Sequence, residues 1–185
     1  RREHIKSCRD NNDNSHEIIA GLYSDPSHFI YELLQNAVDA KASKVIFNLS
    51  SNSLEITHDG KELFEFKNVD SITAVNNSTK KNDINSIGTF GAGFKSVFAI
   101  TKTPYIYSGD YHFKIIDFIV PEKIEPRNLK EQETIIRLPF NHSDISPTIA
   151  YNQISKKLKE LESESLLFLR NVKEIKWNTE SNQGN

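Results

Sequence analysis

Glu32 and Asn36 stand four residues apart in the segment ELLQNAVDA, residues 32–40. On a helix this spacing places both side chains on one side, and Asp39 follows one turn later. A carboxylate can orient or deprotonate an attacking water, and an amide oxygen can ligate Mg²⁺, which prefers oxygen donors. The alternative is a solvated polar face on a surface helix, and the segment taken alone favours that alternative.

A second group is the glycine-rich stretch GTFGAGFKS, residues 88–96, which leads into apolar residues through Ile100. Closely spaced glycines let backbone N–H groups approach an anion, and a helix N-terminus adds partial positive charge. The stretch lacks the Gly-Lys-Ser/Thr ending of a P-loop, and a long polar loop rather than a strand precedes it, unlike a dinucleotide fingerprint. Lys95 either adds positive charge near phosphates or is a solvated lysine.

The third group is His58-Asp59-Gly60 at the end of an alternating segment. An acid at this position could accept a hydrogen bond from an exocyclic amine such as that of adenine. An ordinary Asp-Gly turn is the alternative, and the local sequence favours it.

The hydrophobic pattern predicts the elements that position these groups. Apolar residues recur at three-four spacing from Phe29 to Val38, which predicts a helix capped by Ser27 and ending near Ala40. A polar loop at residues 76–87 is long enough for a functional lid. The remaining helix predictions are a short helix at 16–23, a partly helical segment at 64–75, a glycine-rich turn that runs into an apolar helix at 88–100, and a final helix at 151–163. Strands are predicted at 44–49, 53–57, 105–108, 112–120 and 133–138, with an apolar end at 166–169 and 172–177.

Bulk composition excludes several classes of protein. The net charge of −2 does not indicate nucleic acid as a partner, and no apolar run approaches the roughly 20 residues of a membrane span. Cys8 is the single cysteine, so an intrachain disulfide is impossible and a cytoplasmic location is expected. Because the chain contains no methionine, we expect a fragment of a larger protein.

Helix, hairpin, polar lid and glycine turn follow one another in an order that resembles the GHKL ATPase superfamily, which contains gyrase B, a heat-shock chaperone, histidine kinases and MutL. The resemblance covers about residues 26–108, and the strand 133–138 resembles the closing motif of the family. Residues 87–96 followed by TPYIYSG, residues 103–109, are most similar to the sacsin-like amino-terminal domains of that superfamily.

The resemblance implies an α+β fold: a two-layer α/β sandwich (Bergerat fold) with a mixed, mostly antiparallel sheet and helices on one face. It divides the chain into a polar N-terminal segment at 1–15, an ATP-binding domain at 16–178 and a disordered tail at 179–185.

Site roles follow by resemblance as well. Glu32 resembles the general base and Asn36 the Mg²⁺ ligand, with Asp39 and Ala40 near the nucleotide. Thr134 resembles the threonine that helps hold adenine through water. The start of the lid and its phosphate-binding hinge correspond to Ser78, Thr79, Lys80, Gly88, Phe90, Gly91, Ala92, Gly93, Phe94 and Lys95.

One motif departs from the family, whose adenine motif is Asp-x-Gly-x-Gly. If Gly60 is its first glycine, His58 stands at the adenine-reading aspartate and Glu62 replaces the second glycine. If Asp59 takes that role instead, the spacing is one residue short. Both alternatives stay open at the level of sequence.

By this resemblance the chain binds ATP and Mg²⁺ and hydrolyses ATP slowly, with lid closure driving conformational change in a multidomain protein of chaperone-like or bacterial defence role. Expected partners are the nucleotide, other domains of the same protein, one of which can supply a catalytic residue, and a second copy in a nucleotide-dependent homodimer. The alternative is a non-hydrolysing nucleotide-binding or scaffolding module. A sensor kinase is disfavoured, since it would carry an upstream phospho-accepting histidine helix and usually Asn in place of Glu32.

Overall fold

The computed structural model describes residues 1–3, 6, 27–74, 93–161, 169, 171–179 and 183–184. The predicted helix at 16–23 and the predicted lid at 76–87 lie outside these residues. In the described part the elements are α3 (Phe29–Asp39), β1 (Lys44–Ser50), β2 (Ser53–His58), α4 (Phe66–Ile72), the 3₁₀-helix η2 (Gly93–Ala99), β3 (Tyr105–Ser108), β4 (Tyr111–Ile116), β5 (Val120–Lys123), β6 (Thr134–Pro139), α5 (Pro147–Lys159), β7 (Glu174–Thr179) and β8 (Gln183–Gly184).

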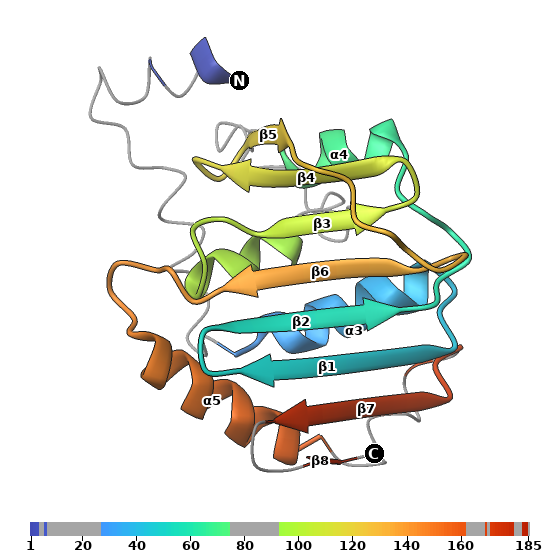
Figure 1. The fold of residues 1–185 in the computed structure, drawn as a ribbon, viewed down its shortest axis with the longest axis vertical. Coiled ribbons are helices and arrows are strands. Elements are labelled where there is room, and N and C mark those ends of the chain that lie inside the picture. Colours follow the sequence, from blue (N-terminus) through green and yellow to red (C-terminus); the bar gives the residue numbers. More distant parts are fainter. Residues whose placement is uncertain are drawn as a thin grey trace, which may run out of the picture.

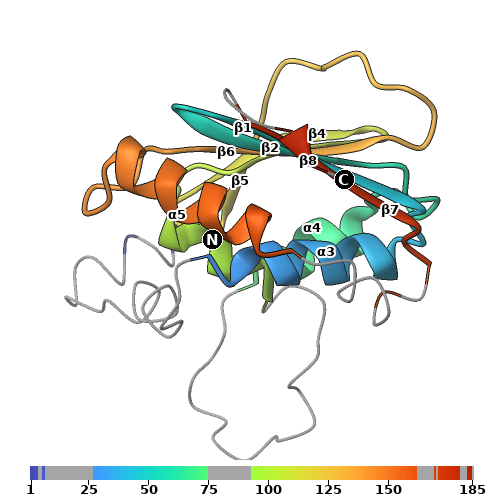
Figure 2. The ribbon, with the colours of Figure 1, turned by 90° about the horizontal axis from the view of Figure 1, so that it is seen from below.

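The strands form one sheet in the order β5-β4-β3-β6-β2-β1-β7-β8 (Figure 1). All described pairs are antiparallel except β1 with β7, which run parallel. The helices lie on one face of this sheet (Figure 2). The prediction of a two-layer α/β sandwich with a mixed, mostly antiparallel sheet is therefore confirmed.

The core lies between the two layers and follows from the two side-chain periods. Helix α3 buries residues at three-four spacing, among them Phe29, Leu33 and Ala37. Strands β1 and β2 bury alternate residues such as Phe47 and Ile56 against them. One face of each element is thus buried in the core, and polar side chains on the other faces are available to form a site.

Several element bounds differ from the predictions. The predicted strand 112–120 is divided into β4 and β5, because Asp117 and Phe118 both adopt positive φ values (48° and 64°), as in a tight hairpin turn. Helix α5 begins at Pro147, since Ser146 caps it by accepting from the N–H of Ile149 at 3.3 Å. The cap residue of α3 is His28 rather than Ser27.

Two further differences concern the ends of predicted segments. The apolar run after the glycines forms the 3₁₀-helix η2 rather than an α-helix. In the segment predicted as a disordered tail, Thr179 ends β7, and Gln183–Gly184 form the short strand β8 that pairs with it.

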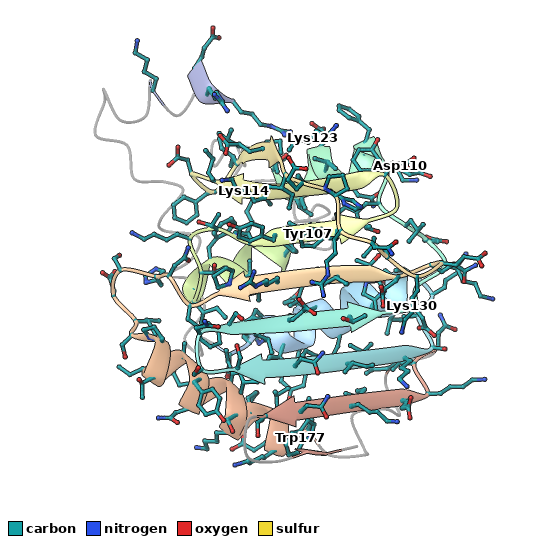
Figure 3. All side chains as sticks on the ribbon, viewed as in Figure 1. Tyr107, Asp110, Lys114, Lys123, Lys130 and Trp177 are labelled. Carbon is teal, nitrogen blue, oxygen red and sulfur yellow. The ribbon has the colours of Figure 1, made fainter. Side chains whose placement is uncertain are left out.

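The other face of the sheet, which is turned toward the viewer in Figure 3, carries polar side chains such as Tyr107 and Lys114. Residues 124–133 cross this face (Figure 2). Arg127 anchors them: its guanidinium binds both carboxylate oxygens of Glu55 at 2.6 and 3.2 Å and lies 5.8 Å from the centre of the Tyr107 ring. This bidentate pair fixes the crossing segment to β2 and β3.

Within the described residues, no helix combines the length and the apolar character needed to cross a membrane.

Phe47→Ala should lower the free energy of unfolding by about 3–5 kcal/mol, because the substitution leaves a cavity where the fully buried ring packs between sheet and helices. The matched control is Phe66→Ala, since Phe66 is 72% exposed at the start of α4. That control should change stability by less than about 0.5 kcal/mol in urea titrations. Equal losses in the two variants would contradict the core as described.

Candidate functional site

Helix α3 presents Glu32 and Asn36 beside its buried stripe. Both side chains are half-buried, as expected for positions that flank the core-facing side of a helix. Glu32 Oε1 lies 3.2 Å from Nε2 of His28, one turn earlier on the same helix. This contact limits the rotamers of the carboxylate and leaves Oε2 directed to a different neighbour.

That neighbour is Gly93, the first residue of η2. A Cβ built on Gly93 would collide with Oε2 of Glu32 and would lie 2.8 Å from its Cδ. Only a residue without a side chain fits here while the carboxylate keeps its position. The acidic residue of α3 and the last glycine of the glycine-rich stretch are therefore in direct contact, although 61 positions separate them in sequence.

A pocket of about 640 Å³ lies alongside this contact, within the usual size range for small-molecule sites. Three buried residues, His58, Phe94 and Ile136, form its floor. Helix α3 contributes Asn36, Asp39 and Ala40 to one side. The opposite wall and rim consist of Lys61, Glu62, Leu63, Phe64, Glu65, Lys67 and Asn68.

His58 ends β2, and its ring is 6% exposed. Its Nδ1 accepts a hydrogen bond from the backbone N–H of Gly60 at 3.1 Å. Burial lowers the pKa of His58 from 6.5 to about 4, and the opposing effect of the neighbouring Asp59 charge is smaller. The imidazole is therefore neutral at physiological pH.

Gly60 makes this arrangement sterically feasible. A Cβ at this position would lie 2.8 Å from both Nδ1 of His58 and Cβ of Ala40. The close approach brings the end of β2 against the end of α3, where Glu62 N also donates to Ala40 O at 3.1 Å. Gly60 itself supports the pocket rather than lining it.

Asp59 has a different environment. Its Oδ1 accepts from the backbone N–H groups of Ser43 and Lys44, both at 2.8 Å, and Oδ2 accepts from the Ser43 hydroxyl at 2.6 Å. Desolvation raises the pKa of Asp59, the hydrogen bonds from Ser43 and Lys44 lower it, and the net result is a lowered pKa. The carboxylate thus holds the start of β1. It lines a separate hollow of about 200 Å³, whereas the larger pocket contains His58 and not Asp59.

Thr134 is fully buried directly opposite His58 in the pairing of β2 with β6. Its hydroxyl lies 2.6 Å from that of Ser108 on β3, and the Ser108 hydroxyl accepts from the N–H of Phe64 at 3.1 Å. Thr134 does not line the pocket. The two hydroxyls instead tie the pocket wall at Phe64 to the sheet.

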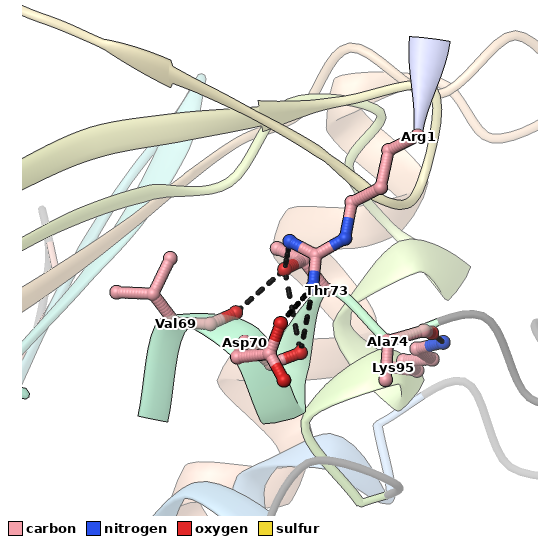
Figure 4. Close-up of polar contacts among 6 residues, drawn as sticks. All are labelled: Arg1, Val69, Asp70, Thr73, Ala74 and Lys95. Carbon is pink, nitrogen blue, oxygen red and sulfur yellow. Dashed lines mark hydrogen bonds and ion pairs between the residues drawn. The ribbon is translucent and has the colours of Figure 1, made fainter. Parts of the chain in front are cut away.

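Lys95 is buried, and its ammonium donates to the backbone carbonyl of Ala74 (Figure 4). Burial first, and then the nearby Arg1 guanidinium, lowers the pKa of Lys95. Arg1 itself pairs with Asp70 at 2.5 Å and contacts Thr73 at the end of α4. Lys95 is neither the solvated lysine of one prediction nor a residue of the pocket.

The fold gathers five of the predicted site residues on one pocket, namely Asn36, Asp39, Ala40, His58 and Phe94. Glu32 and Gly93 contact each other beside it. Asp59, Gly60, Lys95 and Thr134 have supporting contacts outside its lining. The predicted positions that lie outside the described residues are Ser78, Thr79, Lys80, Gly88, Phe90, Gly91 and Ala92.

Sequence reasoning missed three features of the site. His28 beside Glu32 has a usable signal, the four-residue spacing on a helix. The pocket wall at 61–68 has no signal in the sequence, because its mixture of charged and apolar residues resembles a surface segment. Ser108 also has none, since a serine at a strand end acquires its role only through the pairing with Thr134.

No group of three or more His, Cys, Asp or Glu side chains is arranged to hold a metal ion in the described parts of the chain. A magnesium ion held by one amide oxygen and by phosphate oxygens does not require such a group. Asn36, which is the predicted Mg²⁺ ligand, lines the pocket.

Comparison with known proteins adds to this geometry. Residues 53–122 match the Sacsin domain. The chain is 32% identical over 178 residues to Protein NO VEIN from Arabidopsis thaliana, and 32% identical over 108 residues to Sacsin from Homo sapiens. These alignments cover 82% and 48% of the chain. The chain carries a sacsin-like domain.

The sacsin-like domain spans only 6% of the length of the plant protein and 2% of that of the human protein. A solved structure described as the crystal structure of the N-terminal domain of a DNA repair protein has a similar fold, with a TM-score of 0.60 at 15% identity. That alignment covers 92% of the chain and 54% of the other. At this identity the likeness concerns the fold alone.

Gly93→Ala should destabilise the sacsin-like domain, because the new methyl group competes with the Glu32 carboxylate for the same space. The loss should be about 1 kcal/mol in urea unfolding, because the carboxylate is half-buried and can shift at some cost, and Glu32→Ala should remove most of it in the double variant. Fully additive losses in the double variant would contradict the contact.

The buried neutral His58 predicts a loss of stability as the pH falls. Below the unfolded-state pKa of 6.5 the unfolded chain binds a proton that the folded chain excludes until the pH reaches about 4. The free energy of unfolding should be lower at about pH 5 than at about pH 8 by about 2 kcal/mol from this residue.

The matched comparison uses His142, whose Nδ1 also accepts a backbone N–H two residues later at 3.1 Å, outside both pockets. His58→Asn should weaken the pH dependence of urea unfolding, whereas His142→Asn should retain it. The same dependence in both variants would show that His58 is not the titrating group.

Proposed function

We propose that this sacsin-like domain binds ATP with Mg²⁺ and hydrolyses it slowly. The observation that carries the proposal is the contact of Glu32 with Gly93 at the side of a pocket lined by Asn36, His58 and Phe94. A carboxylate, an amide and the end of a glycine-rich stretch thereby meet on the helix-covered side of the sheet. Phosphate, metal and attacking water need these groups in one place.

The pocket suits a purine at its floor. Phe94 and Ile136 offer flat and branched apolar surface, and His58 adds one polar group. The rim carries charges of both signs on Lys61, Glu62, Glu65 and Lys67, which keep the entrance solvated. An apolar floor with few polar groups is the usual composition of a nucleobase site.

Asn36 is the residue that would hold Mg²⁺, because its amide oxygen is a hard donor on the pocket side of α3. When bound, the ion supplies positive charge that offsets the charge of the phosphate oxygens. Asn36 would then orient the polyphosphate toward the end of α3 where Glu32 contacts Gly93.

Glu32 would act as the general base. Its carboxylate takes a proton from a water whose oxygen forms a bond to the γ-phosphorus, while the bond from that phosphorus to the bridging oxygen of ADP breaks. His28, at 3.2 Å, limits the orientations that this carboxylate can adopt. The products are ADP and inorganic phosphate.

In the larger protein, nucleotide turnover would drive conformational change between this domain and its neighbours. The support is the small share of the relatives that the chain spans, 6% and 2%, so that most of their length lies in other domains. The same proposal includes a chaperone-like or defence role and a cytoplasmic location. It also includes lid closure over the nucleotide and dimerisation on nucleotide binding.

A non-hydrolysing nucleotide-binding module is the second candidate. The observation that favours it is the position of Glu32, which contacts Gly93 but is absent from the residues that line the pocket. In that case the pocket binds nucleotide and the carboxylate has only a structural contact.

Glu32→Ala should bind ATP within about threefold of the unaltered chain and lose turnover by about a hundredfold or more, because it removes the base but not the pocket. Asn36→Ala should weaken Mg-ATP binding by about tenfold or more, since it removes a metal ligand. Calorimetry with Mg-ATP and a phosphate-release assay measure the two effects.

Control variants replace the same residue types away from the pocket. Glu160→Ala lies at the exposed C-terminal end of α5, and Asn48→Ala lies on the opposite face of the sheet. Both should bind and turn over ATP normally. Turnover retained in Glu32→Ala favours the second candidate or another base, and no binding of any nucleotide by the unaltered chain ends the proposal.

A further inference from the structure

His58 is the one buried polar side chain among the described residues that line the larger pocket. Alternation along β2 puts its ring on the face of Ile56, which α3 covers, and Thr57 points to the opposite face. The ring therefore lies on the core-facing side of β2, and together with Phe94 and Ile136 it makes up the buried part of the pocket lining.

The hydrogen bond from Gly60 determines which ring nitrogen carries the proton. Because Gly60 N–H donates to Nδ1, that nitrogen is an acceptor, and the proton of the neutral imidazole resides on Nε2. The close packing of Gly60 against Nδ1 and Ala40 keeps this side of the ring closed to any other group.

Nε2–H makes no hydrogen bond within the part of the chain that the structure describes. It is also not sealed in the core, because no buried side-chain nitrogen or oxygen there lacks a partner. The N–H donor is therefore accessible, and no described residue pairs with it. A buried donor of this kind gains most from a ligand that offers an acceptor.

We propose that His58 reads the base of a purine nucleotide by donating from Nε2–H to an acceptor on its six-membered ring, either N1 of adenine or O6 of a 6-oxopurine. The inference rests on the proposed nucleotide binding and specifies its base recognition. An N–H donor cannot accept from an exocyclic amine, so the 6-amino group of adenine is not read by this residue.

The burial of His58 indicates which edge of the base it contacts. With the phosphates toward Asn36 and Gly93, the ribose lies nearer the entrance, and the edge of the purine remote from the sugar reaches the floor. The other buried floor residues, Phe94 and Ile136, offer no side-chain acceptor. The Thr134 hydroxyl lies outside the lining and is engaged with Ser108.

The first experiment uses the unaltered 185-residue chain and four Mg-triphosphates in calorimetry: ATP, purine riboside triphosphate, ITP and 1-deaza-ATP. Purine riboside triphosphate lacks the amine, and ITP replaces it with an oxygen. Both should bind within about threefold of ATP. In ITP N1 carries a proton and O6 is the acceptor, whereas 1-deaza-ATP offers neither acceptor, and it should bind about tenfold more weakly, because Nε2–H is left unpaired.

The second experiment changes the hydrogen-bonding character of residue 58. His58→Asp supplies an acceptor and should make the chain prefer ATP over purine riboside triphosphate by about tenfold. His58→Asn retains an N–H donor and should show no such preference. His142→Asp is the matched control and should leave the order of affinities unchanged, since His142 makes the same backbone contact outside the pocket.

Two results overturn the inference while leaving nucleotide binding in place. They are a loss of about tenfold or more in the unaltered chain when the 6-amino group is removed, and equal binding of ATP and 1-deaza-ATP. Because both use the unaltered chain, they decide the matter even if His58→Asp fails to fold. Absence of binding for all four triphosphates instead overturns the proposed function together with this inference.

Discussion

The burial of one stripe of α3 against β1 and β2 is the constraint on which the site depends. Phe29, Leu33 and Ala37 are buried together, and burial of the two larger side chains stabilises the fold by about 1.5–3 kcal/mol each. Because an α-helix turns once every 3.6 residues or so, fixing this stripe also fixes the direction of Glu32 and Asn36. A rotation of α3 that moved Asn36 out of the pocket or Glu32 away from Gly93 would expose its apolar stripe. The core therefore sets the orientation of the candidate chemistry.

A row of polar side chains runs across neighbouring strands at one end of the core. His58, Thr134 and Ser108 occupy paired positions on β2, β6 and β3, next to the apolar row of Ile56, Ile136 and Ile106. Buried polar groups cost stability unless they are hydrogen-bonded, and the two hydroxyls bond each other while Ser108 also accepts from Phe64. His58 is hydrogen-bonded at Nδ1, and its Nε2 has no partner among the residues that the structure describes. Of this polar row only His58 lines the pocket, where it is the one buried polar side chain among the described lining residues.

Local sequence signals predicted most of the fold and failed where the backbone departs from a regular period. The strand predicted at 112–120 is interrupted because Asp117 and Phe118 adopt left-handed conformations. The apolar pattern of the segment does not predict this turn. The start of α5 did have a signal, Ser146 followed by Pro147, but the apolar period that was used to predict the helix becomes regular only later. The 3₁₀-helix η2 has five consecutive buried residues, a pattern that the single apolar stripe of an amphipathic helix does not predict.

The sequence by itself determined the α/β order of elements, the hairpin of β1 and β2, and the shared side of Glu32 and Asn36, because these depend on spacings of two to four residues. Only the tertiary structure shows that His58 and not Asp59 lines the larger pocket. The two residues are adjacent, so alternation points one into the pocket and leaves the other to bind Ser43 and Lys44, and the direction of that alternation depends on which face α3 covers. The contact of Glu32 with Gly93 was decided in the same way. It joins segments that are distant along the chain, and only packing between layers brings them together.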